Sequence, residues 1–113
     1  MPSILTKRRN AAYSAQQGRC YYCSCLMLPC SGRRQSSVEP DEKLRACTAE
    51  HLQARRDGGR DSPRNVVAAC WYCNHSRHAL HDGRSPRKYR QLVRTMVARG
   101  AWPTTRSPFS GEA

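Results

Sequence analysis

The clearest apolar pattern lies toward the C-terminal end of the chain. Apolar side chains recur there with helical spacing at Tyr89, Leu92, Val93, Met96 and Val97. Positions i, i+3, i+4, i+7 and i+8 form one stripe on an α-helix, the usual face that packs on a core. Ser85 suits the N-cap, Pro86 the first helical position and Gly100 the C-terminal stop. The pattern predicts a C-terminal helix that starts at Pro86 and ends before Gly100.

The middle of the chain reads as strand, loop, strand and helix. Residues 46–53 suit a strand in which Glu50 and His51 point to opposite faces, because side chains alternate along a strand. Residues 55–64 are rich in turn formers, including Gly58 and Gly59. Residues 66–69 form a short apolar run typical of a buried strand. A short helix is then expected from about residue 71 to 81.

The remaining segments flank this unit. Residues 6–17 are predicted as an N-terminal helix, with Thr6 as its N-cap and Gly18 as its stop. Residues 26–45 contain Pro, Gly and Ser and indicate an irregular inserted loop. Residues 1–102 then make a single domain, and residues 103–113 are predicted to be a disordered tail.

Composition raises the question of what stabilises so small a domain. The chain has 113 residues, a formal charge of +12 and few large aliphatic side chains, a combination that favours disorder unless a cross-link or metal intervenes. Seven cysteines supply the means. Disulfides are disfavoured because the N-terminus lacks the apolar run of an export signal, so a reducing cytoplasmic setting is expected. No segment has the length and hydropathy of a membrane span.

The positive charge indicates the kind of partner. Lys plus Arg number 20 against 8 acidic residues, and most of the 20 are Arg. Arginine side chains match phosphate oxygens with two parallel hydrogen bonds. The excess therefore favours DNA or another nucleic acid over a merely solvated basic surface.

Two C-x-x-C pairs predict a structural zinc site at Cys20, Cys23, Cys70 and Cys73. A two-residue spacer lets one turn present two thiolates, and four thiolates bind zinc tetrahedrally. The separation between the pairs is longer than in a compact zinc finger, which the inserted loop explains. Two alternatives remain open: Cys25 could replace Cys23, and Cys30 or Cys47 could form a rival pair.

The residues between and after these pairs suit phosphodiester hydrolysis. That reaction needs a base to deprotonate water, a cation to stabilise charge on the phosphate, and positive groups to hold the strand. A neutral histidine such as His51 suits the first role near pH 7. Asn74 and His78 are spaced i and i+4, so they share a helical face on which both could meet an ion bound by Glu50.

The same residues, in the same order, resemble the HNH endonuclease family. The resemblance rests on Glu50-His51, Gly58-Gly59, Asn65, Cys70-x-x-Cys73-Asn74 and Arg77-His78, and it covers about half of the chain. It implies a small α+β domain with the ββα-metal fold, often clasped by two C-x-x-C knuckles. Helices at the N- and C-terminal ends would flank this domain.

The resemblance also implies roles for individual residues. His51 would be the general base, and Asn65 would orient it through hydrogen bonds. Glu50 and Asn74 would ligate a divalent ion, Mg²⁺ or another metal, with His78 as a third ligand. The basic residues placed to contact phosphates are Arg55, Arg56 and Arg77. The implied activity is metal-dependent hydrolysis of DNA.

Two substitutions depart from the commonest family pattern: Glu50 stands where Asp is usual, and Asn74 replaces the third-letter His. The main rival interpretation is a non-catalytic zinc module that binds nucleic acid through its arginines. A further rival is a subunit that cuts only within a larger phage or restriction machine. One site cuts one strand, so a double-strand break would need a homodimer or two events.

Overall fold

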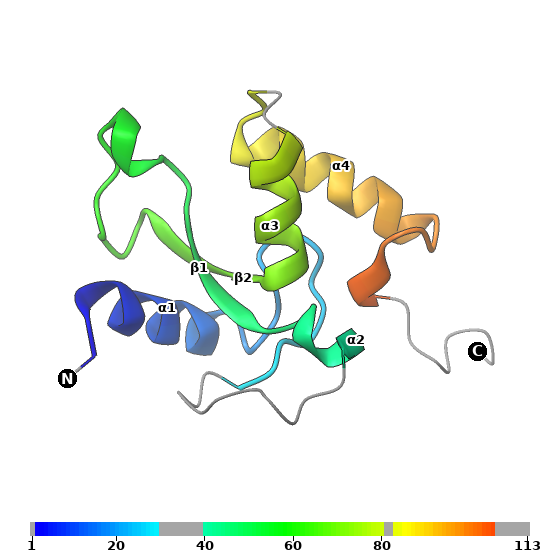
Figure 1. Ribbon diagram of the computed structural model, residues 1–113, viewed down its shortest axis with the longest axis horizontal. Coiled ribbons are helices and arrows are strands. Elements are labelled where there is room, and N and C mark those ends of the chain that lie inside the picture. Colours follow the sequence, from blue (N-terminus) through cyan, green and yellow to red (C-terminus); the bar gives the residue numbers. More distant parts are fainter. Residues whose placement is uncertain (1, 30–39, 81–82, 106–113) are drawn as a thin grey trace.

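An antiparallel hairpin of two strands, β1 (Cys47–His51) and β2 (Val66–Cys70), organises the fold (Figure 1). The computed structural model describes residues 2–29, 40–80 and 83–105. The strands pair with Cys47 opposite Cys70 and His51 opposite Val66. The 3-10 helix η1 (Arg55–Asp57) lies in the loop between them, and α3 (Trp71–Leu80) follows β2 without a break. The predicted order of strand, loop, strand and helix is confirmed, and with it the α+β class.

Helix α1 (Ile4–Ala15) packs against both strands of the hairpin, as does α3 (Figure 1). The prediction that Thr6 is the N-cap is wrong, because the Ser3 hydroxyl accepts a hydrogen bond from the Thr6 backbone N–H at 3.1 Å and starts the helix earlier. At the other end, the amide of Gln16 pairs with the backbone of Ala68 in β2, donating to its carbonyl at 2.8 Å and accepting from its N–H at 3.0 Å. This pairing satisfies the open edge of β2 and fixes α1 on the hairpin.

The predicted inserted loop of residues 26–45 is shorter in the structure. Leu26 bridges back to Arg19, and the N–H of Met27 donates to the carbonyl of Gly18 at 2.8 Å, so these residues close a knuckle around Cys20 and Cys23. Residues 40–43 form a short helix, α2 (Pro40–Lys43). Residues 30–39 of the predicted insertion, including Cys30, lie outside the described residues.

Helix α4 (Pro86–Ala98) confirms the C-terminal helix, with Ser85 as its N-cap. The Ser85 hydroxyl accepts from the backbone N–H of Lys88 at 3.2 Å. Tyr89 and Val93 are fully buried against the cysteine-rich core, and the Tyr89 hydroxyl donates to the carbonyl of Cys73 at 3.1 Å. The amphipathic pattern therefore identified the buried face of this helix correctly.

Beyond α4 the structure differs from the predicted tail. Residues 103–113 were expected to be disordered, but Pro103–Thr105 form the 3-10 helix η2, and Thr104 is buried against the cysteines. The side chains of Trp102 and Thr104 reach cysteine sulfurs, which holds this segment in place. Residues 106–113, the rest of the predicted tail, lie outside the described residues. None of the described helices is long and apolar enough to cross a membrane.

Candidate active site and metal centre

The sulfur atoms of the two C-x-x-C pairs meet in the core. The ligand atoms of Cys20, Cys23, Cys70 and Cys73 lie within 4.8 Å of one another, and all four side chains are buried. The Sγ atoms of Cys23 and Cys70 are 3.9 Å apart. Thiolates about 2.3 Å from a tetrahedral zinc ion lie about 3.8 Å apart, so the spacing fits zinc. Cys25 is also buried beside the cluster but does not belong to this four-residue group.

The cluster sulfurs differ in proton affinity because they contact one another. Hydrogen bonds from Cys23 and the neighbouring cysteines lower the pKa of Cys20. The pKa of Cys73 is raised, mainly by its hydrogen bond with Cys20. Four buried thiols in contact cannot all ionise without a compensating cation, and a bound metal replaces their protons. The donor set therefore fits a structural metal, with zinc the favoured ion.

Hydrogen-bond donors from several parts of the chain surround the sulfurs. The N–H of Cys70 donates to Sγ of Cys20 at 3.2 Å. The indole N–H of Trp102 donates to Sγ of Cys73 at 3.2 Å, and the Thr104 hydroxyl lies 3.1 Å from Sγ of Cys23. Such donors stabilise negative charge on thiolates and orient them. They also explain why η2 is ordered.

Glu50 is the second buried polar centre. Only 2% of Glu50 is exposed, because β1 directs it inward toward the first knuckle and α3. Its Oε2 accepts from the Tyr22 hydroxyl at 2.9 Å and from Arg77 at 3.1 Å, while Oε1 lies 3.2 Å from Nε2 of His78. Burial raises the pKa of Tyr22, and the negative charge of Glu50 raises it further. The Tyr22 hydroxyl therefore stays protonated and serves as a donor.

The carboxylate of Glu50 and the imidazole of His78 fit two neighbouring positions around a divalent ion. Ligand atoms about 2.1 Å from an octahedral ion are about 3.0 Å apart, close to the 3.2 Å between Oε1 and Nε2. Asn74 stays a predicted further ligand through its Oδ1, while its Nδ2 donates to Thr48 Oγ1 and to the carbonyl of Ala49, both at 3.0 Å. The contacts seen for Asn74 therefore anchor α3 to β1.

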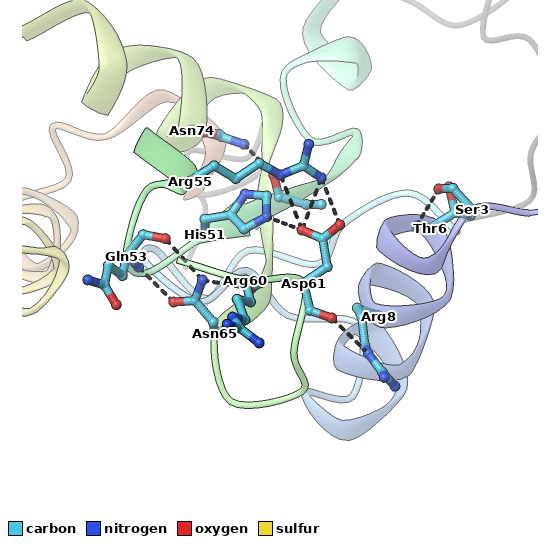
Figure 2. Close-up of polar contacts among 11 residues, drawn as sticks. Ser3, Thr6, Arg8, His51, Gln53, Arg55, Arg60, Asp61, Asn65 and Asn74 are labelled. Carbon is cyan, nitrogen blue, oxygen red and sulfur yellow. Dashed lines mark hydrogen bonds and ion pairs between the residues drawn. The ribbon is translucent and has the colours of Figure 1, made fainter. Parts of the chain in front are cut away.

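His51 lies at the end of β1 and is held by a residue of the following loop (Figure 2). Its Nε2 is 2.7 Å from Oδ1 of Asp61, and 18% of the His51 side chain is exposed. Arg55 donates to both oxygens of the same carboxylate, at 3.0 and 2.8 Å. The hydrogen bond from His51 and then the Arg55 guanidinium hold the pKa of Asp61 below its usual range. Asp61 thus remains ionised and orients the ring.

Asp61 was missed by sequence reasoning, which assigned the orienting role to Asn65. Within the described residues, the Asn65 side chain makes no hydrogen bond to His51. It accepts from the N–H of Gln53 at 2.7 Å and donates to the carbonyls of Gln53 and Arg60 at 3.0 and 2.9 Å (Figure 2). Asn65 therefore closes the loop that carries Asp61. The only signal in the sequence was a carboxylate in the turn-rich segment after His51.

The loop between the strands is also supported from outside. The backbone carbonyl of Asp61 accepts from Nε of Arg8 in α1 at 3.2 Å (Figure 2). At Gly59 a Cβ atom would lie 1.8 Å from the carbonyl oxygen of Gln53, so only glycine fits there. The paired glycines thus serve loop geometry, as their turn-forming character predicted.

The arginines expected to contact phosphates lie in different environments. Arg55 is paired with Asp61, and Arg77 is paired with Glu50 and only 18% exposed. Arg56 is exposed and lines an open pocket of about 340 Å³ beside Glu50's partner His78. The same pocket is lined by Arg84, which precedes the N-cap of α4, and by one carboxylate, that of Asp57, so basic side chains outnumber acidic ones along it. A cavity of this kind suits an anionic ligand.

Comparison with known families supports the resemblance seen in the sequence. Residues 32–80 match the family model described as HNH endonuclease. That segment spans both strands and α3, together with Glu50, His51, Asn65 and the second C-x-x-C pair. A search of the curated proteins found no match. The match over residues 32–80, the α+β hairpin-and-helix arrangement and the buried cysteine cluster are together consistent with a ββα-metal HNH domain, and they indicate a nuclease-type function related to nucleic acids.

Proposed function

We propose that the protein is a metal-dependent HNH endonuclease that hydrolyses DNA phosphodiester bonds, with His51 as the general base. The observation that carries the proposal is the 2.7 Å contact between Nε2 of His51 and the carboxylate of Asp61. A histidine oriented by an ionised carboxylate is the arrangement required to accept a proton from water and to stabilise the imidazolium that results.

The contact also supports a choice of the reacting nitrogen. With Asp61 ionised, Nε2 would carry the proton and donate a hydrogen bond to Oδ1. The lone pair is then on Nδ1, which would take the proton from the attacking water. Arg55 holds the Asp61 carboxylate with three hydrogen bonds, two to Oδ1 and one to Oδ2, so the ring orientation would be maintained when the imidazole becomes charged.

Glu50 and His78 would hold a divalent ion, through Oε1 and Nε2 respectively. When bound, Mg²⁺ or a similar ion supplies positive charge that stabilises the phosphate and the leaving oxygen. Tyr22 and Arg77 keep the other oxygen, Oε2, occupied, which directs Oε1 toward His78. Arg56 and the basic pocket would hold the DNA backbone.

The test is nicking of supercoiled plasmid by the zinc-containing protein with Mg²⁺, Mn²⁺ or Ni²⁺ and with no added divalent ion. A His51→Ala variant that retains zinc is expected to lose nicking by about 100-fold or more, the usual contribution of a general base. Gln91→Ala, an exposed change on α4, serves as the matched control and should leave nicking unchanged. Equal nicking by wild type and His51→Ala would refute the assignment of the base.

A second candidate function has its own supporting observation. Glu50 is already satisfied by Tyr22, Arg77 and His78, so the fold does not require an ion there. That arrangement favours a non-catalytic zinc module that binds nucleic acid. It would be supported if wild type and His51→Ala bind DNA equally and neither nicks with any of the three ions.

A further inference from the structure

An exposed tryptophan stacked on a histidine marks the first turn of α3. Trp71 is 43% exposed, and its ring lies parallel to that of His75, with the centroids 4.5 Å apart and the planes at 9°. The other tryptophan of the chain, Trp102, is buried against the cysteine cluster. Trp71 therefore contributes little to the core, although the imidazole restricts its orientation.

The stacked pair lies on the same side of α3 as the candidate metal site. Trp71, His75 and His78 are spaced i, i+4 and i+7, so they follow one helical face. Seven residues of helix place Trp71 about 10 Å along the axis from His78. Helix α3 also follows β1: the N–H of Trp71 donates to Ala46, and His78 reaches Glu50. The indole and His78, the partner of Glu50, thus lie on one face of α3.

Positive charge lies at the Trp71 end of this face. The N–H of Trp71 donates to Ala46 at 2.8 Å, and that of Tyr72 to Leu44 at 3.0 Å, so residues 44–46 lie at the start of α3. Arg45 belongs to this segment, and the exposed Lys43 directly precedes it, with the carboxylate of Glu42 one residue earlier. Cations beside an exposed aromatic ring are the combination that holds single-stranded nucleic acid, with phosphates on the cations and bases on the ring.

We infer that Trp71 is a stacking platform for an unpaired nucleobase of single-stranded DNA, whose backbone then follows α3 toward His78. The imidazole of His75 covers one face of the indole, so the base would stack on the other. Paired bases within a duplex are already stacked on each other, so an exposed indole selects unpaired ones. Because His75 already orders the indole, less side-chain freedom is lost on binding. The inference rests on the proposed function, since it names the substrate conformation that the same site would take.

Binding of a dye-labelled oligothymidylate, measured by fluorescence anisotropy so that chains with and without Trp71 can be compared, tests the inference. Tryptophan emission with the unlabelled oligonucleotide reports stacking in chains that keep Trp71. The measurement uses the full zinc-containing chain with the His51→Ala change and no added divalent ion, so that cleavage cannot interfere. Stacking should quench the emission of Trp71, while Trp102 serves as an internal reference. Trp71→Ala should weaken oligothymidylate binding about 5- to 150-fold, and Trp71→Phe should weaken it less because a smaller ring remains.

The matched control is Leu80→Ala, since Leu80 is also on α3 and 50% exposed but lies on the opposite side of the helix. It should leave binding unchanged, and zinc content should be equal in all variants. Equal oligothymidylate affinity in Trp71→Ala and wild type would overturn the inference. It would also be overturned if Trp71→Ala weakened the binding of duplex DNA as much as it weakened the binding of oligothymidylate. A change of sedimentation that depends on Trp71 without DNA would also overturn it, because the platform would then contact a second copy of the chain.

Plasmid nicking by chains that keep His51 separates the two proposals. Trp71-dependent quenching without any nicking would contradict the nuclease proposal and keep the platform. Nicking that depends on His51, with binding of oligothymidylate independent of Trp71, would keep the nuclease proposal and contradict the platform.

Discussion

Replacing Tyr22 by Phe tests whether Glu50 is held as the structure shows. The change removes one oxygen from a fully buried ring and leaves its packing against Tyr89 intact. The lost interaction is the 2.9 Å hydrogen bond to Oε2 of Glu50, a carboxylate that is itself only 2% exposed. A hydrogen bond to a charged group contributes about 1.5–3 kcal/mol to stability.

The lower end of that range is expected here, because Arg77 still donates to the same oxygen at 3.1 Å. We therefore expect Tyr22→Phe to lower the free energy of unfolding by about 1.5–2 kcal/mol. For a domain of this size, that corresponds to a fall in Tm of about 6–16 °C. The value should be measured by urea unfolding of the zinc-loaded protein without added divalent ions, in which the m-value stays constant.

Tyr21→Phe provides the matched comparison, since the Tyr21 hydroxyl makes no hydrogen bond within the described residues. It should change the stability by less than about 0.5 kcal/mol. The double variant Tyr22→Phe/Glu50→Gln should be less destabilised than the sum of the two single changes, because the residues share one contact. A Tyr22→Phe change no more destabilising than Tyr21→Phe would mean that the Glu50 carboxylate is not held by Tyr22. Tyr22 would then not direct Oε1 of Glu50 toward His78.

Three further predictions concern the zinc cluster, the loop and acid stability. Cys70→Ser should abolish zinc binding and cooperative unfolding, because the metal supplies folding free energy; calorimetry and metal analysis would check this, and a zinc-free folded variant would contradict it. Gly59→Ala should reduce nicking and stability while zinc is retained, since its Cβ would meet the carbonyl of Gln53 at 1.8 Å; unchanged nicking would mean that the loop tolerates the shift. The pKa of Asp61 is lowered on folding, so its pairing stabilises the protein above the ordinary carboxyl pKa and is lost as pH falls through the lower folded value. Asp61→Asn should therefore flatten the stability curve at the acidic end, in acid titrations followed by circular dichroism, and an unaltered curve would contradict the pairing.

Several features were predictable from the sequence because they depend on local pattern or on fixed spacing. The helical stripe from Tyr89 to Val97 and the cap at Ser85 determine α4 without reference to other elements. Two C-x-x-C pairs predicted the four sulfurs that gather, since each short turn presents two of them, and the structure then decided between Cys23 and Cys25. The order and spacing of the residues around His51 sufficed to indicate the HNH family, which the family match over residues 32–80 supports.

The partners of the site residues were decided by the tertiary structure. Glu50 meets Tyr22 from the first knuckle only because the cysteine cluster brings residues far apart in the chain together. Asp61 replaces Asn65 as the residue that contacts His51, because the loop turns at Gly58 and Gly59 and returns toward the end of β1. Sequence spacing specifies which side chains share an element, but it does not specify how a loop folds back.

The same distinction explains the segment that follows α4. Thr104 belongs to a Pro- and Thr-containing segment that has no periodic pattern, so sequence reasoning assigned residues 103–113 to a disordered tail directly after Trp102. In the structure its order comes from hydrogen bonds to the sulfurs of Cys73 and Cys23. The sequence by itself indicated the strand-loop-strand-helix order, the C-terminal helix, the cysteines placed to bind a metal and the resemblance to the HNH family. The folded chain decided which distant donors and carboxylates meet, because those contacts depend on the packing of separate segments around one buried cluster.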